Sequence, residues 1–234
     1  MSGGGNGIPD DGVGERLRRF QARFEPAITR VLLPGGFVTE TFRAREVEIS
    51  FLGYPGETLY NALYHRLEAL LDDPGPTRRV SIRFLVPDFQ KPMSVPSRVG
   101  PDGAPVDDER FRKRLELKCR EYDRTLSAIA QRLTAVGRTT AECEYRCCPG
   151  IPRDKICIFN RESVLHGLYD VVARTRGYGT EPDYYDPKGY RTDLNMWSRR
   201  DGEDSKAAVA TWSKHFDDLW GLAAKPPWRR GTAP

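Results

Sequence analysis

The sequence lacks any apolar run approaching the roughly 20 residues that a helix needs to cross a bilayer. Its first 14 residues are rich in glycine and lack the basic and then apolar order of a signal peptide. The chain has five cysteines, an odd number that favours reduced thiols over a disulfide framework. These absences together predict a cytoplasmic protein.

A strong excess of charge of either sign is also missing. The formal net charge is +4, which tolerates an anionic ligand but falls short of the dense basic surface of a dedicated nucleic-acid binder. With 234 residues, of which 38% are hydrophobic, the chain is long enough to bury one good core. We expect a single domain over residues 15–224, with a flexible N-terminus at 1–14 and a flexible tail at 225–234.

Metal-binding patterns are absent as well. The three histidines form no HxxxH or HExxH pair, and they lie far apart at His65, His166 and His215. The cysteines at 143, 147 and 148 invite a zinc interpretation but lack a second CxxC-type pair. Cys143, Tyr145 and Cys147 instead share one face of a predicted strand, which is typical of a half-buried strand. We predict neither a metal nor a cofactor.

A strand, helix and strand pattern is the clearest local signal. Residues 46–52 predict a strand, residues 57–71 predict a helix with its leucines on one face, and residues 79–86 predict a second, more continuously apolar strand. Such a βαβ unit has parallel strands. The pattern predicts an α/β protein with a mixed, mostly parallel sheet flanked by helices.

A long helix is predicted over residues 107–136. Its apolar residues recur at four- and three-residue steps and form a seam. The seam residues are Phe111, Leu115, Cys119, Tyr122, Leu126, Ile129, Leu133 and Val136. Such a seam either packs on the sheet or forms a dimer contact.

Weaker patterns predict the remaining elements. They are one helix or two short ones at 15–33, a strand at 37–42, a long irregular loop at 88–106, strands at 139–148 and 155–159, a helix or strand-turn-strand element at 162–174, and a final helix near 204–223.

The segment from Pro152 to Asn160 carries the main functional signal. In a strand, Arg153 and Lys155 point to one face with Cys157 and Phe159, while Ile156 and Ile158 point to the other. A phosphate could then lie between the two cations, with the Asn160 side chain orienting it by a hydrogen bond. The alternative is that both cations are solvated charges at a strand edge.

The spacing of Arg153, Lys155 and Asn160 resembles the HxKxxxxD signature of the phospholipase D superfamily, with arginine in the histidine place and asparagine in the aspartate place. The order of predicted elements over about 45–174 is similar to one half of a phospholipase D-type domain. The resemblance implies an anion-recognising fold. It also implies loss of the family's usual catalysis, because an arginine cannot replace the histidine nucleophile. Since that family needs two motifs and we find one, the resemblance further implies a homodimer.

Three other places are candidates for chemistry. His166 is the candidate replacement nucleophile or proton carrier, unless it is a structural histidine. Residues 178–200 interleave aromatic and basic side chains, with Tyr190 and Arg191 as candidate ligand contacts, unless this loop simply packs its aromatics over the domain. The turn at 53–56 either directs helix amides at a phosphate or is an ordinary turn.

These patterns favour a non-catalytic, phospholipase D-like module that recognises a phosphate-bearing ligand, such as a nucleotide, nucleic acid or headgroup, in a regulatory or sensing role. One alternative is a dimeric phosphodiesterase or phosphotransferase with a substituted active site. Another is a protein-interaction module that dimerises through the helix at 108–136.

Overall fold

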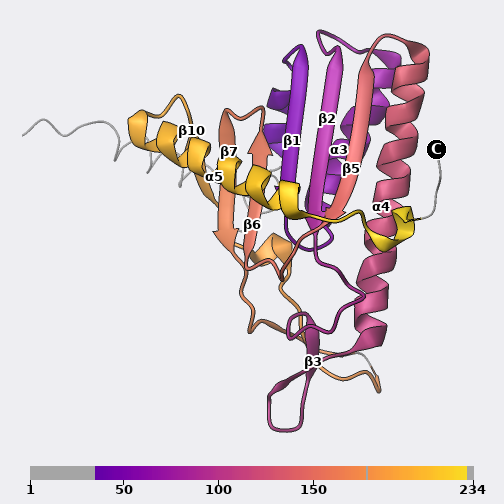
Figure 1. Cartoon of the computed structure of the whole chain (residues 1–234), viewed down its shortest axis with the longest axis vertical. Coiled ribbons are helices and arrows are strands. Elements are labelled where there is room, and N and C mark those ends of the chain that lie inside the picture. Colours follow the sequence, from indigo (N-terminus) through magenta and orange to yellow (C-terminus); the bar gives the residue numbers. More distant parts are fainter. Residues whose placement is uncertain (1–34, 178, 231–234) are drawn as a thin grey trace, which may run out of the picture.

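A six-stranded sheet forms the centre of the protein in the computed structural model, which describes residues 35–177 and 179–230 (Figure 1). The strand order is β10-β7-β6-β1-β2-β5. The bounds are Glu46–Leu52 for β1, Arg79–Val86 for β2, Thr140–Cys147 for β5, Asp154–Phe159 for β6, Ser163–Leu168 for β7 and Asn195–Ser198 for β10.

The sheet is mixed, as predicted, but it is not mostly parallel. The pairs β1–β2 and β2–β5 are parallel, whereas β6 pairs antiparallel with both β1 and β7, and β7 pairs antiparallel with β10. Residues 148–153 form a short connection that stays at the end of the sheet where β5 finishes. The chain therefore enters β6 from that end, and β6 runs antiparallel to β1. A tight turn with positive φ at Asn160 and Arg161 then reverses β6 into β7.

Helices cover both faces of this sheet. The helices α3 (Glu57–Asp72) and α4 (Glu109–Val136) lie on one face, and α5 (Glu203–Leu222) crosses the other. The α/β class is confirmed, and the predicted βαβ unit agrees with β1, α3 and β2 almost residue for residue. No helix in the described part of the chain has the length and apolar character to span a membrane.

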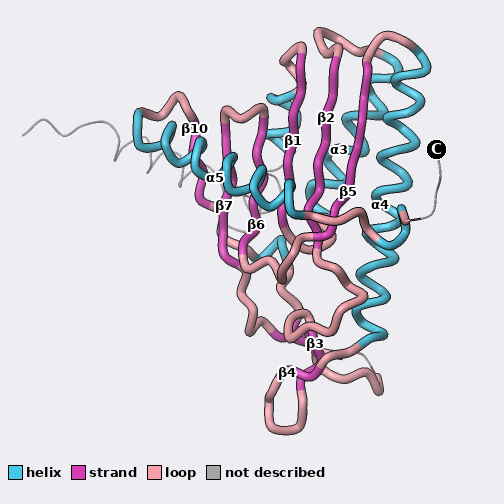
Figure 2. Tube along the Cα trace, in the orientation of Figure 1, coloured by secondary structure: helices cyan, strands magenta, loops and turns pink. Residues whose placement is uncertain are grey.

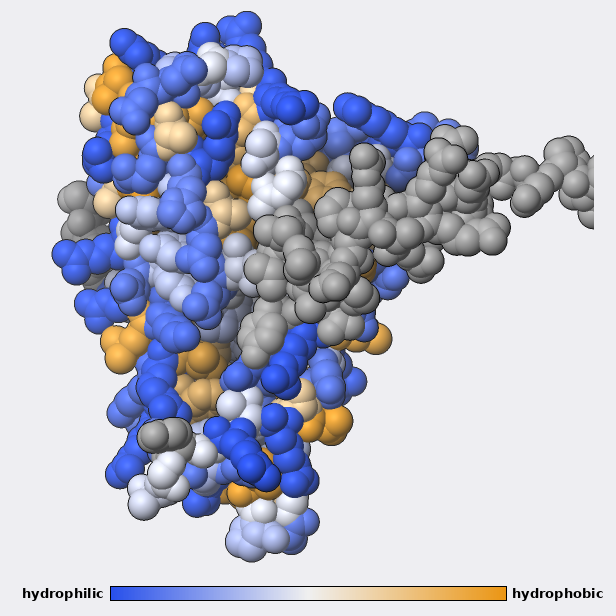
Figure 3. Space-filling view, turned by 180° about the vertical axis from the view of Figure 1, so that it is seen from behind, coloured by the Kyte–Doolittle hydropathy of each residue, from blue (hydrophilic) through white to orange (hydrophobic). Residues whose placement is uncertain are grey.

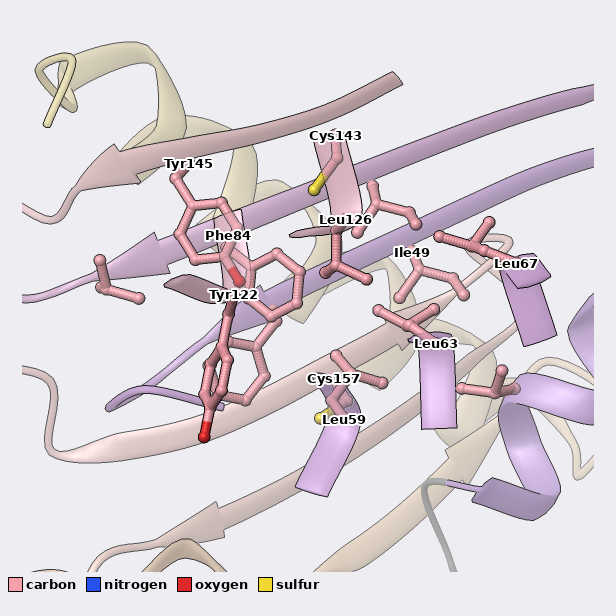
Figure 4. Close-up of a cluster of buried hydrophobic side chains, with 14 of the residues drawn as sticks. Ile49, Leu59, Leu63, Leu67, Phe84, Tyr122, Leu126, Cys143, Tyr145 and Cys157 are labelled. Carbon is pink, nitrogen blue, oxygen red and sulfur yellow. The ribbon is translucent and has the colours of Figure 1, made fainter. Parts of the chain in front are cut away.

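The core on the α3 and α4 side contains most of the predicted seam of α4. Leu59, Leu63 and Leu67 of α3 pack with Tyr122 and Leu126 of α4 over the strands (Figure 4). The outward surface on this side is mostly hydrophilic, with scattered hydrophobic areas (Figure 3). Of the two alternatives for the seam, packing on the sheet is therefore the one that most of its residues adopt.

The alternation along β6 follows the prediction. Cys157 and Phe159 belong to the core under α3 and α4, whereas Ile156 and Ile158 belong to the smaller core under α5. Cys143, Tyr145 and Cys147 of β5 are likewise buried on alternate positions, as expected for a half-buried strand.

Two predictions near the start of the chain have different outcomes. The strand predicted at 37–42 is wrong, because residues 35–41 are helical. Val38 and Phe42 are four residues apart and both are buried, so the helical spacing of these apolar side chains outweighs their strand propensity. The helix predicted at 15–33 lies outside the described residues.

The region predicted as an irregular loop contains part of a second sheet. This small antiparallel sheet has the order β4-β3-β9-β8 and consists of β3 (Ser97–Val99), β4 (Pro105–Val106), β8 (Arg174–Thr175) and β9 (Tyr184–Tyr185). Figure 2 labels β3 and β4. Its strands are only two or three residues long and include pairs between distant parts of the sequence, so no local sequence pattern predicts them. Of the alternatives for residues 162–174, the helix is wrong, since β7 and β8 occupy this segment.

The predicted tail is attached over residues 225–230. A short 3₁₀ helix, η2 (Pro227–Arg229), places Trp228 and Arg229 against α4. The Trp228 Nε1–H donates to Asp123 Oδ2 at 2.8 Å, and the Arg229 Nε–H donates to the same oxygen at 2.7 Å. Part of the segment predicted as a flexible tail thus packs on the domain through hydrogen bonds to a buried carboxylate.

Candidate functional site

A pocket lies at the edge of the main sheet where β1 ends and β6 begins. Because β6 is antiparallel to β1, Ile156 pairs with Leu52, and Lys155 therefore lies at the carboxyl end of the parallel strands. In open α/β sheets, ligands bind beyond this edge, in the crevice where the strand connections diverge. The pocket has a volume of about 660 Å³, a size suited to a small organic ligand.

Two kinds of side chain line this pocket. Apolar and aromatic walls are formed by Phe51, Tyr54, Leu59, Pro96, Leu115 and Tyr169. Charged residues come from the start of α3, from α4, from β6 and from the segment 186–189. They are Glu57, Lys118, Lys155, Asp186 and Lys188. A mainly apolar cavity with a few converging polar groups is the usual form of a small-molecule site.

Lys155 is the most unusual of these residues. Only 3% of its surface is exposed, and its Nζ donates a hydrogen bond to the Gly189 carbonyl oxygen at 2.9 Å. Burial lowers the pKa of Lys155 from its ordinary value, and the nearby Cys157 partly opposes that shift. Within residues 35–177 and 179–230, Lys155 forms no ion pair, and its hydrogen-bond acceptor is the neutral Gly189 carbonyl.

The start of α3 forms the wall next to β1. Gly56 caps this helix in the left-handed conformation, with φ of 76°, and among the described residues no side chain accepts from the first amides. Those amides carry a partial positive charge that favours an anion. The preceding loop is held by Tyr169, whose hydroxyl accepts from the Tyr54 N–H at 3.2 Å. A side chain at Gly53 would collide with that hydroxyl, so the loop requires glycine there.

Acidic groups also line the pocket. Glu57 lies 3.7 Å from Lys118, so these two charges form a loose ion pair at the rim. Burial raises the pKa of the Asp186 carboxyl, while Lys188, Lys118 and a hydrogen bond from Thr175 oppose that rise. The pocket therefore offers both cationic and anionic groups rather than a single sign of charge.

The structure does not bring Arg153, Lys155 and Asn160 together. Arg153 precedes β6, is exposed and does not line the pocket. Asn160 lies at the far end of β6, about 17 Å along the strand from Lys155. Its Oδ1 accepts from the Glu48 N–H at 2.7 Å, and its Nδ2 donates to the Thr41 carbonyl at 3.3 Å. Asn160 thus fixes the turn after β6 to the neighbouring chain.

His166 faces the opposite side of the sheet from Lys155. It lies on the α5 side, where its ring stacks on Trp212 with 3.9 Å between ring centroids and its Nε2 lies 2.8 Å from Asp154 Oδ1. Within one chain it is therefore out of reach of the pocket. This placement does not support His166 as a nucleophile beside Lys155 of the same chain.

The predicted segment 178–200 contributes residues 186–189 to the pocket lining. Gly189, which accepts from Lys155, begins the 3₁₀ helix η1 (Gly189–Arg191) that also contains Tyr190. Arg191 is exposed and is not part of the pocket lining. Tyr184 and Tyr185 are buried in the small sheet. The aromatic side chains at 184 and 185 therefore pack on the domain, and residues 186–189 are the part of this segment that lines the pocket.

Sequence reasoning missed Lys118 and Asp186. Lys118 stands on α4 beside the predicted seam, and only the packing of α4 on α3 turns it toward this cavity. Asp186 directly follows β9, and the β3–β9 pairing brings it to the pocket. A helical projection of 109–136 would have placed Lys118 next to the buried side, whereas nothing local indicated Asp186.

Other reactive groups are not gathered in this pocket. No cluster of three or more His, Cys, Asp or Glu side chains that could hold a metal occurs in residues 35–177 and 179–230. All five cysteines are buried and unpaired with one another, and burial raises the pKa of Cys157 to about 11. A thiol with such a pKa is a poor nucleophile at neutral pH.

Comparison of the sequence with protein-family models gives no match, and comparison with curated proteins gives none either. The function is therefore argued from the pocket itself.

Proposed function

We propose that this protein is a binding module for a small phosphate-bearing ligand and that it acts in a regulatory or sensing role. The observation that carries the proposal is the buried ammonium of Lys155 in the wall of a ligand-sized cavity. Burying an unpaired charge costs roughly several kcal/mol of folding free energy, and an anion bound beside that charge would offset much of this cost.

The start of α3 supports an anion at the same place. Residues of its first turn line the cavity, and no side chain of the described residues caps its first amides. Backbone amides at a helix start and a lysine ammonium both bind phosphate in proteins. The resemblance of the Lys155 segment to the phospholipase D signature points to the same ligand chemistry, with Lys155 as the retained residue.

The absence of a suitable nucleophile favours recognition over catalysis. Arg153 stands in the place of the histidine in that signature, and its guanidinium is exposed outside the cavity. His166 lies on the other face of the sheet, and Cys157 is a buried thiol with a raised pKa. The described residues that line the cavity offer no activated nucleophile next to the ammonium.

Thermal-shift screening and a hydrolysis assay test this proposal together. We expect a phosphate monoester such as p-nitrophenyl phosphate to raise the melting temperature of the wild type but not of Lys155→Met. We expect no turnover of bis(p-nitrophenyl) phosphate by either protein with a metal chelator present. Hydrolysis that disappears in Lys155→Met would overturn the non-catalytic proposal, and the lack of any phosphate-dependent shift would overturn recognition.

A further inference from the structure

The cavity lining includes an acidic residue, Asp186, that recognition of phosphate alone does not explain. Asp186 lines it on the segment whose Gly189 carbonyl accepts from Lys155. Asp186 also lies close enough to Tyr54 to raise the pKa of that phenol, although burial is the larger cause. A carboxylate repels phosphate, so Asp186 must serve a different part of the ligand or none.

Asp186 and the partner of Lys155 are close along the chain. Three residues span at most about 11 Å in a fully extended backbone, so Asp186 lies within that distance of Gly189. The hydrogen bond from Lys155 to Gly189 therefore ties the ammonium and the carboxylate to one short wall. One small ligand can meet both groups, with its anionic end at Lys155 and a hydrogen-bond donor at Asp186.

Hydroxyl groups are suitable donors for that carboxylate. Thr175 already hydrogen-bonds to Asp186, and an ionised carboxylate has about four acceptor positions. The vicinal hydroxyls of a sugar can use two of the remaining positions. In dinucleotide-binding folds an acidic residue binds ribose hydroxyls in this way, so the chemistry is well suited to a ribose.

The remaining walls require an apolar or aromatic part of the ligand. Phe51, Tyr54, Leu59 and Leu115 line the cavity, and its volume of about 660 Å³ far exceeds the size of inorganic phosphate. A sugar phosphate alone would leave these walls in contact with water. A flat nucleobase can cover aromatic and apolar walls and supply the missing contact area.

We infer that the ligand is a ribonucleotide, with its phosphate at Lys155 and the start of α3, its ribose hydroxyls at Asp186 and its base against the apolar walls. This inference rests on the proposed function and narrows it to one class of phosphate-bearing ligand. The inference predicts tighter binding of a ribonucleotide than of free phosphate, a sugar phosphate or a dideoxynucleotide.

Isothermal titration calorimetry on the full chain tests the inference without any substitution. The probes are AMP, GMP, CMP, UMP, ribose 5-phosphate and inorganic phosphate. We expect at least one of the four nucleotides to bind at least about tenfold more tightly than ribose 5-phosphate, because stacking of the base adds contact area. If ribose 5-phosphate binds as tightly as every nucleotide, the base has no site and the inference fails.

A matched pair of ligands and variants tests the role of Asp186. Removing both ribose hydroxyls, as in a 2′,3′-dideoxynucleotide, should weaken binding to the wild type by at least about tenfold. In Asp186→Asn the two ligands should differ less, because the amide is a weaker acceptor. Asp201→Asn, an exposed site outside the cavity, is the charge control and should behave as the wild type. Equal loss from the wild type and from Asp186→Asn would overturn the assignment of Asp186.

The outcomes separate this inference from the proposed function. If none of these probes and no phosphate monoester binds the wild type, both fail. If phosphate esters bind in a manner that depends on Lys155 while nucleotides gain nothing over ribose 5-phosphate, only the ribonucleotide inference fails. Circular dichroism melts of each variant establish that a loss of binding reflects the site and not unfolding.

Discussion

Two buried charges in this molecule differ in how the chain satisfies them. Asp123 on α4 is 2% exposed and accepts hydrogen bonds from Ser127, Trp228 and Arg229. Lys155 on β6 is 3% exposed and donates to a single carbonyl. A fully satisfied buried charge fixes structure, whereas a buried charge at a cavity with one neutral partner is available to a ligand.

The Asp123 cluster should show the largest loss of stability when it is broken. Replacing Arg229 by methionine removes the cation that offsets the buried carboxylate, so we expect a loss of about 3–5 kcal/mol in the free energy of unfolding. Urea denaturation followed by circular dichroism measures it. Arg230→Met is the neighbouring control, because Arg230 is exposed and its Nε donates only to the Lys225 carbonyl. Equal effects of the two substitutions would contradict a structural role for the Asp123 cluster.

The turn at the far end of β6 should show the next largest effect. Asn160→Ala places an alanine at φ of 50° and leaves the Glu48 N–H without its acceptor. We expect a loss of about 2–3 kcal/mol in unfolding free energy. Asn160→Gly relieves the backbone strain but does not restore the hydrogen bond, so its unfolding free energy should exceed that of Asn160→Ala by about 1 kcal/mol. Loss of phosphate-ester binding in folded Asn160→Gly would show that Asn160 belongs to the site after all.

Lys155 should behave in the opposite way from Asp123. Lys155→Met removes a buried ammonium that forms no ion pair with the described residues, and it introduces an apolar side chain of similar length. We expect the unfolding free energy to stay within about 1 kcal/mol of the wild type or to rise. A loss of more than about 2 kcal/mol in the same denaturation assay would place Lys155 with the structural charges.

The pH dependence of stability should sharpen the same contrast by a smaller amount. The pKa of Lys155 is lower in the folded chain than its ordinary value of 10.5. Between these two pKa values the unfolded chain holds a proton that the folded chain releases, so stability rises with pH. Unfolding free energies measured from about pH 7 to about pH 10 should therefore rise in the wild type relative to Lys155→Met. A constant difference between the two proteins would contradict a lowered pKa at Lys155.

The predictable part of the fold was the part with strong local periodicity. The leucines of α3, the seam of α4 and the alternation along β6 each show their spacing within one element, and all three were predicted correctly. The direction of β6 and the pairing of β3 with β9 depend on which distant segments meet, and periodicity carries no such information. The strand predicted at 37–42 failed because Val38 and Phe42 also fit a helical spacing.

The candidate site was predictable only at Lys155. The sequence placed this lysine on the correct face of its strand, where it lines a cavity. Arg153 was assigned to the same face, but β6 begins at Asp154, so the strand alternation does not extend to it. Asp186 and Lys118 reach the cavity through the small sheet and the packing of α4. Those contacts are tertiary, so sequence spacing did not indicate them.

The most direct test compares Lys155 and Arg153, the two cations of the segment that resembles the phospholipase D signature. Calorimetry should measure the affinity of p-nitrophenyl phosphate for the wild type, Lys155→Met and Arg153→Met. We predict that Lys155→Met weakens binding by at least about tenfold, since it removes a charge-assisted hydrogen bond, while Arg153→Met stays within about twofold of the wild type. Unchanged affinity in Lys155→Met, or a greater loss in Arg153→Met, would contradict the assignment of the buried lysine as the phosphate-binding group.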